Sequence, residues 1–112
     1  MTREEIHACA MALPAATHVV QWGGSDVYKV GGKVFAVAGL NGGLAFRVSE
    51  IGFMVLTEDG GPGRQAPYFA KGRWVIVDLD AVDMDAAAGW IAVSHALIAA
   101  KLTRAVKAEL GL

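Results

Sequence analysis

Five basic and four aromatic residues are the side chains of this sequence best suited to bind a ligand. The basic residues are Lys29, Lys33, Arg47, Lys71 and Arg73. The aromatic residues are Trp22, Tyr28, Tyr68 and Trp74. Phosphate binding needs several cations on one surface, and aromatic rings beside them can stack on unpaired bases. The two sets together form a candidate nucleic-acid-binding surface, and the aromatic set alone forms a candidate small-ligand pocket.

The same residues have a purely structural alternative. Charged side chains along strands protect a sheet from pairing at its edges, and tryptophan rings often fill a core. The net charge is −1, whereas dedicated nucleic-acid-binding domains are usually strongly basic. Near the C-terminus, Lys101, Arg104 and Lys107 recur every three residues, and such cations complement the negative end of a helix without any partner.

Other residue patterns argue against metal, cofactor and catalytic chemistry. A run of acids resembles a metal cluster but lacks the glycine turn and distal glutamate of a calcium loop, so helix capping explains it. Zinc needs four converging ligands, and the chain has one cysteine and three dispersed histidines. Ser94 and His95 are adjacent on an expected helix and therefore diverge. The run of acids discussed above consists of Asp78, Asp80, Asp83 and Asp85. We expect no metal, no cofactor and no enzymatic activity.

The elements that would position these side chains follow from spacing and turn residues. Thr2 and Glu5 form a capping box for a first helix, which ends near Leu13 because Pro14 follows. Residues 18–22, 26–30, 33–38 and 44–48 read as strands of an antiparallel meander, with tight turns at the paired glycines 31–32 and at Asn41-Gly42. In residues 26–30, alternation places Lys29 on the opposite side from Tyr28.

The second half of the chain adds two helices and a central strand. Ser49 is the expected N-cap of a short helix over residues 50–57, and residues 58–67 read as a loop rich in glycine and proline. The apolar run 73–79 predicts a buried strand. Asp83 or Asp85 caps a long final helix that carries apolar residues from Trp90 to Val106.

These elements predict an α+β fold in one domain over residues 1–112. The expected architecture is a two-layer sandwich, in which an antiparallel sheet carries an N-terminal helix, a short middle helix and a long C-terminal helix on one face. The chain order is one helix, three or four strands, a helix, one or two strands and a helix. With 54% hydrophobic residues, a single cysteine and no stretch long enough to span a bilayer, we expect a cytoplasmic location.

An ordered set of short strings resembles a known family. The strings are WGGSDVYKVGGKVFA from Trp22 to Ala36, Leu13-Pro14, Ala66-Pro67-Tyr68, Lys71 and Arg73-Trp74-Val75. Their order resembles the MmcQ/YjbR family of small bacterial proteins, and the resemblance covers residues 2 to about 101. It implies a secretion-chaperone-like or frataxin-like α+β fold and the DNA-binding role with which the family is often labelled.

Three functions remain open on the sequence. The first is a non-enzymatic module that binds DNA weakly and with a steep dependence on salt, through the basic surface. The second is a protein-interaction or chaperone-like module, which an exposed apolar patch or a dimer would favour. The third is a small-ligand pocket near Trp22, Tyr68 and Trp74. We expect a monomer or a weak homodimer, and no membrane partner.

Overall fold

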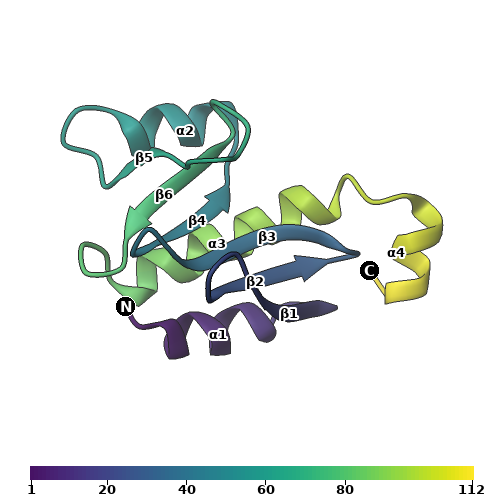
Figure 1. Cartoon of the computed structure of the whole chain (residues 1–112). Helices are drawn as coiled ribbons and strands as arrows, with labels where there is room; N and C mark the ends of the chain where they lie inside the picture. The colour runs from purple at the N-terminus through teal and green to yellow at the C-terminus, as the bar shows by residue number, and fades with distance from the viewer.

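One antiparallel sheet of six strands organises the chain (Figure 1). The structure is a computed structural model that describes all residues, 1–112. The strands lie in the order β1-β2-β3-β4-β6-β5. This arrangement confirms the predicted α+β class. The elements are α1 (Arg3–Met11), β1 (Ala16–Gln21), β2 (Ser25–Val30), β3 (Lys33–Leu40), β4 (Gly43–Arg47), α2 (Glu50–Thr57), β5 (Gly63–Gln65), β6 (Trp74–Asp78), α3 (Met84–Ala99) and α4 (Arg104–Leu110).

The strand register defines two faces of the sheet. Residues directly opposite each other on neighbouring antiparallel strands point to the same side. One row of such partners is Tyr28, Ala36, Phe46, Val75 and Gln65, and we call its side the helix face. The next row is Val27, Val37, Ala45, Ile76 and Arg64, and we call its side the open face.

Helices α1, α2 and α3 all pack on the helix face. The Tyr28 hydroxyl bonds His7 of α1, and the Phe46 ring stacks on Trp90 of α3 with centroids 5.3 Å apart. Helix α2 packs against β5 and β6. As predicted, the helices lie on one side of the sheet (Figure 1). None of them is long and apolar enough to cross a bilayer.

A bulge in β3 connects the sheet to α3. Tyr28 pairs with Ala36 and Lys29 with Val34, so Phe35 is an extra residue that no β2 residue opposes. A bulged residue leaves a gap in the ladder of backbone hydrogen bonds. Ser94 of α3 fills this gap, because its Oγ donates to the Phe35 carbonyl at 2.6 Å and accepts from the Arg47 amide at 2.9 Å.

The local start signals are confirmed. Thr2 and Glu5 form the capping box of α1. Ser49 caps α2 by accepting from the Gly52 amide, and Asp83 caps α3 by accepting from the Ala86 amide. The first helix ends earlier than predicted, at Met11.

Two other predictions are wrong. The final helix is not continuous, because it breaks between α3 and α4 and Thr103 caps a new helix. Leu102 in the break is buried against the β2–β3 turn, where a Cβ on Gly31 would lie 2.7 Å from its side chain. The expected loop over residues 58–67 also contains a short strand, β5, which pairs with β6 and forms one edge of the sheet.

The Ser94 bridge yields a stability prediction. The substitution Ser94→Ala leaves two buried backbone groups without partners, and each such group costs about 1–3 kcal/mol. We expect the free energy of unfolding to fall by about 2–4 kcal/mol in urea denaturation. Ala96→Ser, on the exposed side of the same helix, is the control and should change stability little. Equal losses in both variants would contradict the role given to Ser94.

Candidate functional site on the open face

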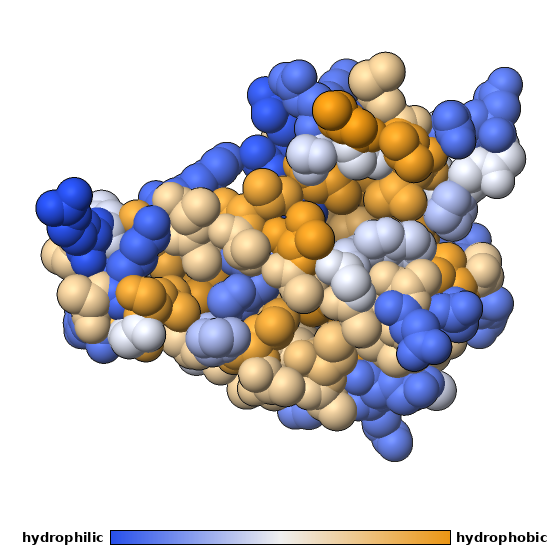
Figure 2. Space-filling view, turned by 180° about the vertical axis from the view of Figure 1, so that it is seen from behind, coloured by the Kyte–Doolittle hydropathy of each residue, from blue (hydrophilic) through white to orange (hydrophobic).

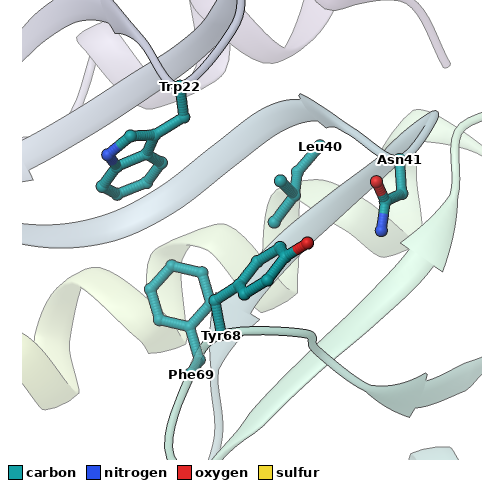
Figure 3. A pocket seen from close by; sticks show the side chains of 5 residues that line it. All are labelled: Trp22, Leu40, Asn41, Tyr68 and Phe69. Carbon is teal, nitrogen blue, oxygen red and sulfur yellow. The ribbon is translucent and has the colours of Figure 1, made fainter.

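A cleft lined mainly by aromatic side chains lies on the open face. It has a volume of about 550 Å³ and is lined by Trp22, Leu40, Asn41, Tyr68 and Phe69. Trp22 comes from the β1–β2 turn, Leu40 and Asn41 from the end of β3 and the turn that follows, and the other two from the β5–β6 loop. In Figure 3 these side chains lie on the side of the strands away from α3. The lining offers one amide and otherwise apolar or aromatic groups.

Aromatic rings build the wall of the cleft. Phe69 stacks on Trp74 with centroids 4.2 Å apart and planes 20° from parallel, and it meets Trp22 edge-on at 6.2 Å. Trp74 is 6% exposed and supports Phe69 from behind without lining the cleft, while Trp22 is 53% and Tyr68 90% exposed. Two of the four predicted aromatic residues, Trp22 and Tyr68, thus line the cleft. Phe69 was missing from the predicted set, although it directly follows Tyr68 in the sequence.

Tyr28, the fourth predicted aromatic residue, does not belong to the cleft. It is fully buried on the helix face, where its hydroxyl bonds His7 Nδ1 at 2.9 Å and its ring lies 5.1 Å from that of His18. Burial, followed by the nearby charge of Asp26, raises the pKa of Tyr28 to about 12. The error follows from strand alternation, which points neighbouring residues to opposite faces.

The backbone of the cleft is strained. Only four residues other than glycine have a positive φ, and three of them line the cleft: Trp22 at 51°, Asn41 at 49° and Tyr68 at 71°. Asparagine tolerates this left-handed conformation, but other L-residues lose roughly 1–2 kcal/mol in it. Strained residues of this kind cluster at ligand-binding and active sites, where the surrounding structure holds them.

Gln65 holds the loop that carries Tyr68 and Phe69. Its Nε2 donates to the Ala66 carbonyl at 2.8 Å, to the Phe69 carbonyl at 3.3 Å and to the Ala70 carbonyl at 3.4 Å. Its Oε1 accepts from the Gly72 amide at 2.9 Å. One side-chain amide therefore satisfies the inward-facing backbone groups of the loop and fixes the position of the two rings.

The predicted basic residues divide between the faces. Lys29 alternates with Tyr28 and Arg47 pairs with Trp74, so both lie on the open face, and Lys71 is exposed on the β5–β6 loop. Lys33 pairs with Val30, which places it on the helix-face side of the β2–β3 turn. The five predicted cations therefore do not form one surface.

The basic residues also differ in their partners. Arg73 is held by Glu50 of α2 at 3.5 Å, whereas Lys29, Arg47 and Lys71 make no ion pair. Burial and the neighbouring Arg73 lower the pKa of Arg47, and its Nε is buried without a hydrogen-bond partner. Lys29 and Lys71 are thus unpaired, whereas Arg47 is half-buried and also lines the groove between α2 and α3.

The cations lie at different distances from the cleft. Lys71 lies on the same loop as the cleft residues Tyr68 and Phe69, and Arg47 pairs with Trp74, on which Phe69 stacks. Lys29 lies farther away, four residues along β2 from Ser25, which is about 13 Å at about 3.3 Å per residue. A ligand that used the cleft and Lys29 together would be elongated.

A polar cluster on the helix face joins α1 to β1 and β2. Asp26 accepts from Arg3 Nε at 2.8 Å and bonds His18 Nε2 at 2.9 Å. Burial acts to raise the pKa of Asp26, but the hydrogen bonds and charges of His18 and Arg3 outweigh it, so that the pKa lies below its ordinary value. Neither this cluster nor any other brings together three side chains able to hold a metal ion.

An apolar surface lies on the other side of the molecule, over α2 and α3. Ile51, Met54 and Val55 of α2 and Val93 of α3 are each more than half exposed. Figure 2 shows apolar residues gathered on this side around a hollow. A groove of about 260 Å³ lies between the two helices, and Trp90 forms part of its wall.

Comparisons with known proteins settle the family. The model of the YjbR family matches residues 11–97, most of the length. The chain belongs to the YjbR family. No curated protein matches its sequence. This YjbR-family chain is similar to the crystal structure of Deinococcus radiodurans protein DR2400, described as a DUF419 domain, with a TM-score of 0.87 and 22% identity over 99% of this chain and 88% of that one. At this identity the similarity shows a shared fold alone.

The strain at Tyr68 can be measured. We expect Tyr68→Asn to raise the free energy of unfolding by about 1 kcal/mol, because asparagine adopts the left-handed conformation more readily. The ring is 90% exposed and has little burial to lose. Tyr68→Phe keeps the strain and should leave stability unchanged in the same urea titration. A loss of stability in Tyr68→Asn would show that the ring supports the fold.

The Asp26 cluster predicts a pH dependence of stability. Because the folded-state pKa of Asp26 is lowered, its contribution is present above the unfolded-state pKa of about 4 and is lost as the pH falls through the folded value. Asp26→Asn should therefore be less stable than wild type at neutral pH, and the difference should shrink below about pH 4. Asp80→Asn, an exposed acid without a hydrogen bond, is the control. A difference that stays constant down to pH 3 would contradict the linkage.

Proposed function

We propose that this YjbR-family protein is a non-enzymatic module that binds single-stranded DNA along the open face of its sheet. An unpaired base would occupy the aromatic cleft, and backbone phosphates would meet Lys29, Arg47 and Lys71. The observation that carries the proposal is that the exposed rings of Trp22 and Tyr68 share this side of the molecule with Lys29, Arg47 and Lys71, none of which makes an ion pair.

The cleft suits a planar ring. Base–aromatic stacking contributes about 1–3 kcal/mol per base, and it works for every base because each has a π-face. Asn41 at the cleft wall offers a donor and an acceptor to a base edge. A single strand can turn one base out into such a cleft, whereas a duplex keeps its bases stacked inside. The aromatic lining therefore favours a single strand.

The charges support weak binding with moderate salt dependence. The net charge is −1, so attraction to a polyanion has to come from the local cations. Three phosphate contacts would give a slope of about −2 in a plot of log affinity against log salt concentration, at about 0.7 per contact for single strands. Much of the affinity would then come from stacking and would survive added salt.

The cleft supports binding and not catalysis. None of its five lining residues is a histidine, an acid, a cysteine or a lysine, and its polar groups are the Asn41 amide, the Tyr68 hydroxyl and the Trp22 indole N–H. General acid–base or nucleophilic catalysis needs a proton acceptor or a nucleophile within reach of the substrate. The proposal therefore keeps the protein non-enzymatic.

Fluorescence anisotropy with labelled single-stranded and duplex DNA tests the proposal. We expect wild type to bind the single strand more tightly than the duplex. Trp22→Asn should weaken single-strand binding roughly tenfold, because it removes one stacking ring while keeping the left-handed backbone. Lys29→Glu with Lys71→Glu should weaken binding at low salt and flatten the salt dependence.

Two control variants separate the site from general effects. Tyr68→Phe keeps the ring and should bind as wild type does, and Lys101→Glu makes the same charge change at an exposed position beyond the end of α3. The proposal would be contradicted if wild type did not bind at low salt, or if Lys101→Glu lost as much affinity as the variant with Lys29→Glu and Lys71→Glu. Either result would favour a protein-interaction function for the apolar surface over α2 and α3.

A further inference from the structure

We infer that β1 is an interaction edge that pairs with β1 of a second copy of this chain. The two strands would run antiparallel about a two-fold axis and join two sheets into one. This inference concerns the edge of the sheet, and it holds whether or not the open face binds DNA.

Strand β1 lacks the usual protection of an edge strand. Its six residues, Ala16–Gln21, include no Lys, Arg, Asp, Glu or Pro. It pairs with β2 in continuous register without a bulge, and none of its residues is buried. Val19 is 37% and Val20 57% exposed. A regular, uncharged edge strand with exposed β-branched residues presents unpaired backbone groups to any matching strand.

The opposite edge is protected in each of these respects. Strand β5 has only three residues, and Pro62 precedes it. Arg64 lies in its centre and pairs with Asp78 at 3.1 Å. Helix α2 packs beside it. Short length, charge, proline and a covering helix are the devices by which sheets avoid edge pairing. The sheet therefore has one closed edge and one available edge (Figure 1).

The chemistry of β1 favours a second copy as its partner. A strand without Lys, Arg, Asp or Glu meets its own copy without repulsion between such charges, and its histidine, His18, is hydrogen-bonded to Asp26 on the helix face. In a two-fold pair the open faces of both sheets must lie on the same side. Each β1 residue therefore faces a residue of the second copy that lies an even number of positions away in the sequence, and the residue at the two-fold axis faces its own counterpart. The register centred on Val19 brings the two exposed Val19 side chains together and pairs Thr17 with Gln21 of the second copy.

This geometry has a consequence for the open face. Pairing of the β1 strands would make the two open faces continuous. Trp22 directly follows β1, so the antiparallel arrangement would place the two Trp22 rings at opposite ends of the joint. If the open face binds a strand of DNA, as proposed above, the dimer would offer two clefts to one ligand.

Sedimentation over a range of protein concentration tests the inference. We expect wild type to dimerise, and the double variant Thr17→Lys, Val19→Lys to raise the dimer dissociation constant at least tenfold, because like charges would face each other across the joint. Val93→Lys adds charge on the exposed face of α3 and should leave the dimer intact. A wild type that stays monomeric at every concentration would overturn the inference, as would dissociation by Val93→Lys alone.

Cysteine cross-linking gives a second readout that does not depend on the lysine variants folding. In a Cys9→Ser background, Val19→Cys should oxidise readily to a covalent dimer, because directly opposed residues have Cα atoms within disulfide range. Val93→Cys in the same background measures the rate of random collision. Equal rates for the two variants would overturn the inference. DNA binding by a strictly monomeric protein would leave the proposed function intact while removing the dimer.

Discussion

The central strands of this sheet are apolar on both faces, and the helices cover only one. Val27, Val37, Ala45 and Ile76 form a fully buried row on the open face, although no helix packs there. Exposure of this row would cost about 25 cal/mol for each Å² of apolar surface. On this side the β1–β2 turn and the β5–β6 loop meet through the edge-on contact of Trp22 with Phe69, and the cleft lies beside these rings. The candidate site thus shares Phe69 with the side chains that pack against the core.

The aromatic rings at the cleft differ in how far they are buried. Phe69 and Trp74 stack face to face and close the core, and the loop that carries Phe69 is fixed by the Gln65 amide. Tyr68 adds little to that cover, because 90% of it is exposed, yet its backbone is held in the left-handed region. A strained, exposed aromatic residue beside a hollow is what a preorganised binding site requires. The left-handed backbone of Tyr68 and the hydrogen bonds of Gln65 therefore act together, and they hold the Tyr68 ring exposed in a fixed orientation.

The structural features that depend on neighbouring residues along the chain could be predicted from the sequence. The features that depend on contacts between distant residues were missed. Capping at Thr2, Ser49 and Asp83 and the two-residue turns need only local residue types, and all were found. The break after α3 was missed although Thr103 is a local capping signal, because the burial of Leu102 beside Gly31 that accompanies the break is a contact between distant residues. At the site, alternation along β2 already placed Tyr28 and Lys29 on opposite faces, so the predicted surface combined residues that cannot share one side. Phe69 carried no pattern of its own, and its role comes from the long-range stack on Trp74.

The central claim is that the open face, and not the helix side, meets the ligand. Amide and indole resonances of isotope-labelled protein, followed by NMR during titration with a short single-stranded oligonucleotide, test it residue by residue. Binding on the open face would shift the Trp22 indole signal, the amides of the β5–β6 loop and that of Lys29, and would leave α2 and the exposed side of α3 unchanged. Shifts confined to Ile51, Met54 and Val93, or none at all, would contradict it.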